Sequence, residues 1–191
     1  MQNKGEGEDM GALKEEELPY YVYEDYQNWE GDWELIYGLA YAMAPAPMIK
    51  HQSISNNIAY ELKVALQDCK VCQALLPVDW KIAEDTVVQP DNSVICHEPT
   101  HQAYITKAPK IIFEVLSKST EKKDKGLKYK LYEEAKVSYY CIIDPEVSNA
   151  KVYELQDEKY VNICDAKDAV VEFKLDECEG KIEFDFSKIW S

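Results

Sequence analysis

The sequence predicts an α/β (α+β) domain in which helices flank a mixed β-sheet. Residues 110–117 form a nearly continuous apolar run, which is typical of a strand buried on both faces. Residues 119–135 begin with hydroxyl side chains that can cap a helix, and residues 137–144 form a second apolar run. A strand, a helix and a strand in this order indicate a crossover connection within one sheet.

The residues before this unit predict a tail and the first part of the domain. Residues 1–17 are polar and strongly acidic, so we expect a disordered tail followed by a single domain over residues 18–191. Residues 20–29 are rich in aromatic side chains and predict a short helix. From residue 48 to 67 apolar residues recur at helical spacing and predict a longer helix.

Further strands are predicted where apolar residues run together or alternate with polar ones. These segments are 33–45, with two short strands, 71–83, with one or two strands interrupted by Pro77, and then 87–96, 151–155, 159–163 and 181–186. The segment 87–96 is interpreted as one strand with Pro90 and Asp91 in its middle. A polar loop is expected from there to about residue 109.

Hydropathy argues against a protein that spans a membrane. No apolar run approaches the roughly 18 residues that a membrane helix needs. The first residues also lack the apolar core of a signal peptide. We therefore expect a cytoplasmic protein with no membrane partner.

The chain has 6 cysteines, which would be enough for a disulfide framework. A chain of this size does not need one, and without an export signal we expect reduced thiols. Cys69 and Cys72 form a lone CxxC motif with no second pair at the spacing of a zinc ribbon. Metal binding there stays open beside a structural role at a helix end and a strand start. Cys96, His97 and His101 form a weaker cluster, expected in a surface loop.

The net charge of −15 argues against a nucleic-acid partner, because phosphate binding needs cations. The charge is unevenly distributed, however: residues 1–34 carry −9, residues 133–191 carry −8, and residues 35–132 carry +2. Binding of nucleic acid by the middle segment is therefore not excluded. The chain contains no arginine, the side chain that contacts guanine best, so little sequence-specific readout is expected.

Glu114 lies inside the apolar run IIFEVL. An ionised carboxylate in a buried strand is costly unless it is paired with a cation or binds a metal. Two interpretations of Glu114 therefore stay open at this point, a metal ligand and a structural pair with a lysine.

Asp91 is a second candidate, 23 residues before Glu114 and directly after Pro90. Taken alone, it is equally well explained by a turn after a proline. If the two carboxylates converge, they form a site of hard oxygen ligands suited to Mg²⁺. Such an ion lowers the pKa of a bound water and stabilises the leaving oxygen of a phosphodiester, so the pair predicts a site for phosphodiester hydrolysis.

A site of this kind also needs an amine near the attacked phosphate. The usual position, two residues after the glutamate, is occupied here by Leu116. The segment 118–130 offers substitutes, because it contains 6 lysines and 2 acidic residues. Most of these lysines are expected on a solvated helix face. Lys128 shares a face with the apolar residues that follow it, so its amine is expected to reach back toward the strand.

Four stretches of the chain resemble the Uma-type restriction endonucleases, a branch of the PD-(D/E)XK nuclease superfamily. They lie within residues 33–155, in the family's order: WELIYGLAYAMAPAPMIKHQSISNNI, VVQPDNSVI, PKIIFEVLSKSTEKKDKGLKYKLYEEAKVSYYCIIDP and KVYEL. The third is the most specific, with E-V-L-S-x-S-T, then D-K-G-x-K-x-x-L-Y, then a strand ending in Asp-Pro. The resemblance implies a restriction-endonuclease-like fold, Mg²⁺ or Mn²⁺ as cofactor, DNA as substrate and often a homodimer.

The resemblance also assigns roles to residues of this chain. Asp91 and Glu114 match the metal carboxylates, and Lys128 matches a lysine that has moved from the strand to the helix. Glu34 matches the acidic residue of the family's Y-E-L-I-D-G motif. For His51, at a position where the family often has histidine, a role in the site and a role at the helix start both stay open.

The sequence departs from the family's pattern at three positions. Trp33 replaces a tyrosine, Tyr37 replaces an acidic residue, and Lys118 stands where the family usually has proline. The first two differences affect the surroundings of Glu34 and leave the pair of Asp91 and Glu114 intact.

The predicted function is a metal-dependent endonuclease that hydrolyses phosphodiester bonds in DNA. Two alternatives stay open. One is a relative with a degraded site that acts as a binding or assembly module, which the missing arginines, the acidic ends and Leu116 favour. The other is a metal-dependent hydrolase of a small phosphorylated substrate, which would need no extended basic groove.

Overall fold

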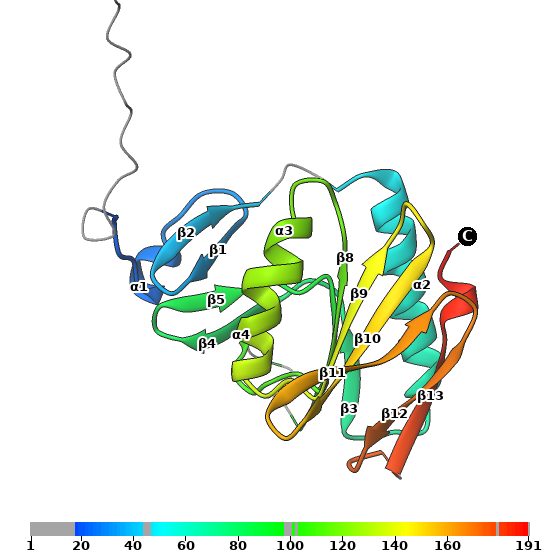
Figure 1. Ribbon diagram of the computed structural model, residues 1–191. Coiled ribbons are helices and arrows are strands. Elements are labelled where there is room, and N and C mark those ends of the chain that lie inside the picture. The colour runs from blue at the N-terminus through cyan, green and yellow to red at the C-terminus, as the bar shows by residue number, and fades with distance from the viewer. Residues whose placement is uncertain (1–17, 44–46, 98–100, 102, 179, 191) are drawn as a thin grey trace, which may run out of the picture.

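The computed structural model describes residues 18–43, 47–97, 101, 103–178 and 180–190 (Figure 1). The segment 1–17, expected to be a tail, lies outside these residues. The elements follow in this order: α1 (Tyr23–Tyr26), β1 (Trp33–Ile36), β2 (Leu39–Ala42), α2 (Ile49–Ala65), β3 (Cys72–Leu75), β4 (Asp79–Ala83), β5 (Thr86–Val88), β6 (Asn92–Cys96), β7 (Tyr104–Ile105), β8 (Ile111–Val115), α3 (Glu121–Lys123), the π-helical segment η2 (Asp124–Lys128), α4 (Tyr129–Glu134), β9 (Tyr139–Asp144), β10 (Asn149–Gln156), β11 (Lys159–Ala166), β12 (Val170–Leu175), β13 (Gly180–Asp185) and the 3₁₀ turn η3 (Phe186–Lys188).

The strands form three sheets. The central one has six strands in the order β11-β10-β9-β8-β6-β3, and only its pair β8 and β9 is parallel. A five-stranded sheet has the order β2-β1-β5-β4-β7, and β12 pairs with β13 in a separate hairpin. The parallel neighbours β8 and β9 are joined through α3, η2 and α4, so the predicted crossover unit and the mixed sheet are confirmed.

The side chains of β8 alternate between two cores, because successive residues of a strand point to opposite faces of the sheet. Ile111, Phe113 and Val115 pack in the core formed with α2 and the hairpin β12–β13. On the opposite face Ile112 packs with residues of α4, β9 and the five-stranded sheet. This alternation directs Glu114 toward the helical segment rather than toward α2, which lies on the far side of the sheet (Figure 1).

Four local expectations differ from the structure. The polar loop expected up to about residue 109 contains the short strand β7, which pairs with β4. The predicted strand 87–96 is two strands of different sheets, because Pro90 has no N–H for a ladder and the chain bends at Asp91. The hairpin strand β12, with the alternating sequence VVEFKL, was missed. The predicted helix 119–135 is interrupted by the π-helical turn η2. No helix of the described residues is long and apolar enough to cross a membrane.

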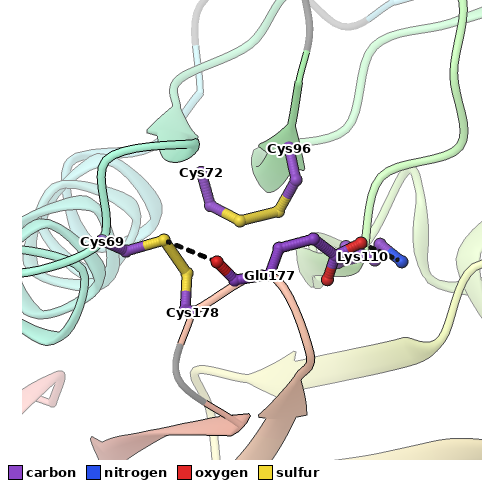
Figure 2. Close-up of a disulfide and its surroundings, with 6 residues drawn as sticks. All are labelled: Cys69, Cys72, Cys96, Lys110, Glu177 and Cys178. Atoms are coloured by element: carbon purple, nitrogen blue, oxygen red, sulfur yellow. Dashed lines mark hydrogen bonds and ion pairs between the residues drawn. A yellow bond between two sulfur atoms is a disulfide. The ribbon is translucent and has the colours of Figure 1, made fainter.

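The expectation of reduced thiols is wrong for four of the cysteines in this structure. Disulfides join Cys69 to Cys178 and Cys72 to Cys96 (Figure 2). Cys72 and Cys96 are direct partners on the paired strands β3 and β6, so Cys96 is buried rather than part of a surface loop. Strand pairing brings these residues together across long stretches of sequence, and local patterns do not reveal it.

Candidate active site

Glu114 is the centre of a buried polar cluster. Its side chain points from β8 toward η2 and α4, and the residue is 3% exposed. The Oε1 atom accepts hydrogen bonds from Lys128 Nζ at 2.9 Å and from the Tyr132 hydroxyl at 2.6 Å. The predicted burial of this carboxylate and its approach to Lys128 are therefore both present in the structure.

Lys128 is the last residue of η2 and is also 3% exposed. Besides its bond to Glu114, its Nζ lies 2.7 Å from Glu34 Oε1 and 4.0 Å from Asp124 Oδ1. Single π-turns within α-helices are frequent at functional sites, because the extra residue changes which side chains face inward. Here the π-turn buries both Asp124 and Lys128.

Glu34 lies on β1 and is completely buried. Its carboxylate accepts hydrogen bonds from the backbone N–H of Gln89 at 3.0 Å and from Lys123 Nζ at 2.5 Å, in addition to its ion pair with Lys128. Burial acts to raise the pKa of Glu34, but the two ammonium groups outweigh it and hold this pKa below its ordinary value. Glu34 is therefore an ionised residue that fixes the position of Lys128.

Asp91 lies in the bend before β6, at the end of β8 where Glu114 sits. Its Oδ2 accepts a hydrogen bond from the backbone N–H of Val115 at 2.7 Å. The same oxygen is 3.3 Å from His51 Nε2 near the start of α2. Asp91 therefore lies beside Val115, the residue that follows Glu114. Both interpretations of Asp91 apply in the structure: it lies in a turn after Pro90, and it lies near Glu114.

His51 faces the cluster from the other side of Asp91. Burial acts to lower the pKa of His51, but the hydrogen bond and the charge of Asp91 raise it more, so this pKa lies above its ordinary value. Its Nδ1 is buried without a hydrogen-bond partner among the described residues. Both interpretations of His51 are therefore compatible with its place in the third position of α2 and its contact with Asp91.

Asp124 is a member of the cluster that the sequence reasoning missed. It is 1% exposed, and its Oδ1 has no hydrogen-bond partner among the described residues. Burial raises the pKa of this carboxyl, against the attraction of Lys128. Its spacing of four residues before Lys128, in the D-K-G-x-K stretch, is the signal that could have identified it.

The cluster has more acidic groups than basic ones. Four carboxylates converge, namely Glu34, Asp91, Glu114 and Asp124, whereas the cations that contact them are Lys123, Lys128 and, when protonated, His51. Burial raises the pKa of Glu114 well above its ordinary value, despite Lys128, and the neighbouring carboxylates add to this effect. Hard oxygen donors are the ligands that Mg²⁺ prefers, and a cation bound among them would offset this excess.

Two further positions have a clear place outside the cluster. Leu116, which stands where a strand lysine would be expected, is 8% exposed and packs in the core beside α4. Lys118 is exposed in the turn between β8 and α3. The structure therefore brings Lys128, and not Lys118, into contact with Glu114.

Comparisons with known proteins bear on the family and the fold of this chain. The model of the Uma2 family, described as "Putative restriction endonuclease", matches residues 21–172. No match is found among the curated proteins. Among solved structures, the crystal structure of a putative nuclease belonging to DUF820 from Anabaena variabilis ATCC 29413 has a TM-score of 0.71 at 17% sequence identity, covering 88% of this chain and 97% of that chain. The predicted nuclease-like mixed fold is thereby confirmed.

Proposed function

This chain belongs to the Uma2 family of putative restriction endonucleases, and from that membership we propose that it is an endonuclease that hydrolyses phosphodiester bonds in DNA with Mg²⁺ or Mn²⁺. The observation that carries the proposal is the excess of carboxylates in the cluster, in which Glu114 and Asp124 are buried and Asp91 is partly exposed. A divalent cation in this cluster would offset the excess and supply a Lewis acid and an activated water.

In this proposal Asp91 and Glu114 hold the cation. Asp124 joins them because its Oδ1 is buried without a hydrogen-bond partner among the described residues, with the Lys128 ammonium 4.0 Å away. Lys128 supplies the positive charge that orients the attacking water or steadies the phosphate. Its amine is held between Glu114 and Glu34, so it needs little reorganisation when charge develops on the phosphate.

Glu34 acts in this proposal as a positioning residue rather than a metal ligand. Its carboxylate is already engaged by two lysines and one backbone N–H. His51 has a comparable role on the other side, where it contacts the carboxylate of Asp91 at 3.3 Å.

DNA is the substrate that the surrounding charges favour. Lysines exposed on the turn and helical segment after β8 can contact the phosphate backbone: Lys118, Lys122, Lys125 and Lys130. The chain contains no arginine, so we propose contacts with the backbone and little readout of base sequence.

One observation favours the alternative of a degraded site that serves binding or assembly. Glu114 Oε1 is already bonded to Lys128 and Tyr132, as in a structural Glu–Lys pair. Such a pair would exist without any metal, and the two proposals therefore differ in whether the wild-type protein binds a divalent cation.

Supercoiled plasmid and single-stranded DNA, incubated with Mg²⁺, Mn²⁺ or EDTA, test the endonuclease directly. We expect nicked or linear plasmid only with a divalent cation, and no cleavage by Asp91→Asn. Asp168→Asn, at an exposed aspartate outside the cluster, is the matched control and should cleave normally. Titration calorimetry with Mn²⁺ is run in parallel. A wild-type protein that neither binds the ion nor cleaves either DNA supports the degraded site.

A further inference from the structure

Four cysteines from distant parts of the chain meet at one end of the six-stranded sheet. Cys69 follows α2, and Cys72 is the first residue of β3. Cys96 ends β6, and Cys178 lies in the turn between β12 and β13. Figure 2 shows their side chains converging, with the two disulfides next to each other.

Three sulfur atoms of this cysteine cluster are close enough to share one ion. The Sγ atoms of Cys69, Cys72 and Cys178 all lie within 4.8 Å of one another, although Cys72 is not bonded to either of the other two. Cys96 Sγ is bonded to Cys72 and lies outside this group of three. If both S–S bonds are reduced, three thiols therefore point into one small volume and the thiol of Cys96 lies next to them.

We propose that the reduced protein binds one Zn²⁺ through the thiolates of Cys69, Cys72, Cys96 and Cys178. Zinc in structural sites prefers four sulfur or nitrogen ligands in a tetrahedron, and two of them commonly come from a CxxC motif such as residues 69–72. The second pair, which is absent from the local sequence, is supplied by strand pairing and by the hairpin turn. This site is chemically distinct from the carboxylate cluster, because soft thiolates select zinc whereas carboxylates suit Mg²⁺.

The position of the cysteine cluster explains what such an ion would do. The hairpin β12–β13 forms a sheet of its own, and it packs on the central sheet through apolar side chains such as Phe173 and Phe184. Cys178 is the hairpin's contribution to the cluster, whereas Cys69 follows α2 and Cys72 and Cys96 lie in the central sheet. A bound zinc ion would link the hairpin β12–β13 to the central sheet when the disulfides are reduced.

The charges around the cysteine cluster fit this proposal. Lys110 lies beside it and forms an ion pair with Glu177 at 2.7 Å (Figure 2). A zinc ion with four thiolates has a net charge of −2, which the ammonium group of Lys110 would offset in part, since Glu177 is already paired with it. Without a cation, four thiolates so close together would repel one another and would remain protonated.

The disulfide form and the zinc form are alternatives related by a balanced reaction. A dithiol supplies two electrons and two protons to each S–S bond and becomes a disulfide itself. A phosphine supplies the two electrons and becomes a phosphine oxide, while one water supplies the oxygen of that oxide and the two protons. Reduction of both S–S bonds yields four thiols. Binding of Zn²⁺ by four thiolates then releases their protons to solvent. A two-electron oxidant such as hydrogen peroxide reverses the process, because each pair of thiolates forms a disulfide and the ion is released.

The test begins with wild-type protein reduced by a phosphine, loaded with Zn²⁺ and desalted without oxygen. We expect one zinc per chain by elemental analysis, and a melting temperature that rises by about 10 °C in excess zinc. Co²⁺ in place of zinc should give thiolate-to-cobalt charge-transfer absorption and the visible bands of a tetrahedral ion. Cys72→Ser should lose both signals, whereas Cys164→Ser, at a cysteine outside the cluster and in no disulfide, should keep them.

Asp91→Asn separates this proposal from the proposed nuclease activity, because it should keep the thiolate–cobalt spectrum while losing cleavage. Reduced wild-type protein that is folded by circular dichroism but retains no zinc, or that gives cobalt bands without thiolate charge transfer, overturns the proposal. If the reduced protein unfolds, recovery of the fold on adding Zn²⁺ but not Mg²⁺ supports it. Failure to recover with zinc contradicts it.

Discussion

Lys128 Nζ lies 2.9 Å from Glu114 Oε1, although the two residues are 14 positions apart and belong to different kinds of secondary structure. The ammonium group of Lys128 thus reaches Glu114 from the helical segment. It takes the place of a lysine on the strand, where this chain has Leu116.

Replacement of Lys128 should lower cleavage more than replacement of Lys118. We expect Lys128→Met, which keeps the volume of the side chain, to reduce single-turnover cleavage by a factor on the order of a hundred or more, because one preorganised charge is lost. Lys118→Met should mainly weaken DNA binding, and the loss should shrink as the salt concentration rises, because removing a phosphate contact makes the salt dependence of binding shallower. Both variants are measured at two ionic strengths. The opposite ranking would contradict the role assigned to Lys128.

Glu114→Gln should abolish divalent-ion binding and cleavage while the fold survives or gains stability. Burial already raises the pKa of this carboxyl well above its ordinary value, so removing the charge relieves a desolvation cost. Mn²⁺ titration and urea unfolding measure the two effects on the same sample. If Glu114→Gln unfolds and the wild-type protein does not bind Mn²⁺, Glu114 is part of a structural ion pair.

Asp124→Asn should weaken Mn²⁺ binding by about tenfold, a typical loss for a single contact of about 1.4 kcal/mol. In the absence of divalent ions the same variant should be as stable as the wild type or more stable, because a buried carboxylate with a raised pKa is replaced by a neutral amide. Glu121→Gln, on the exposed side of the adjacent helical turn, is the matched control and should change neither property. If the wild-type protein and Asp124→Asn bind Mn²⁺ with equal affinity, Asp124 does not contribute to ion binding.

Deletion of residues 1–17 should leave the melting temperature almost unchanged. This segment is acidic and poor in apolar residues, so it has little surface to bury. Thermal unfolding of the shortened chain beside the full chain checks this expectation. A fall of many degrees would mean that the domain starts earlier than residue 18.

The parts of the structure that local patterns specify were predicted from the sequence. The apolar run around Glu114 predicted β8, and the apolar face shared by Lys128 predicted that its amine would turn inward. The place of Asp124 was missed because a regular helical period does not reveal a π-turn. The engagement of Glu34 by Lys123 depends on how β1 packs against a helix 89 residues away, which no local signal contains.

The disulfides were missed for a related reason. Cys72 and Cys96 are neighbours only because β3 pairs with β6, and Cys178 joins them only because a hairpin packs against α2. The CxxC motif was visible in the sequence, but its partners were 24 and 109 residues from the cysteines to which they are joined. A metal or redox site of this kind can be recognised from sequence spacing only when one short segment contributes its ligands.

The hydrogen bond from the Val115 N–H to Asp91 Oδ2 makes one backbone amide an internal reporter of the site. The strand pairing of β6 with β8 ends at Asn92 and Phe113, so this amide is satisfied by a side chain rather than by the ladder. Asp91→Ala would leave the Val115 N–H without an acceptor and lower the free energy of unfolding by about 1–3 kcal/mol. Asparagine is the better replacement because it keeps an acceptor oxygen. The amide resonance of Val115 should shift when an ion draws electron density from Asp91, and a chemical-shift titration could follow occupancy without any DNA.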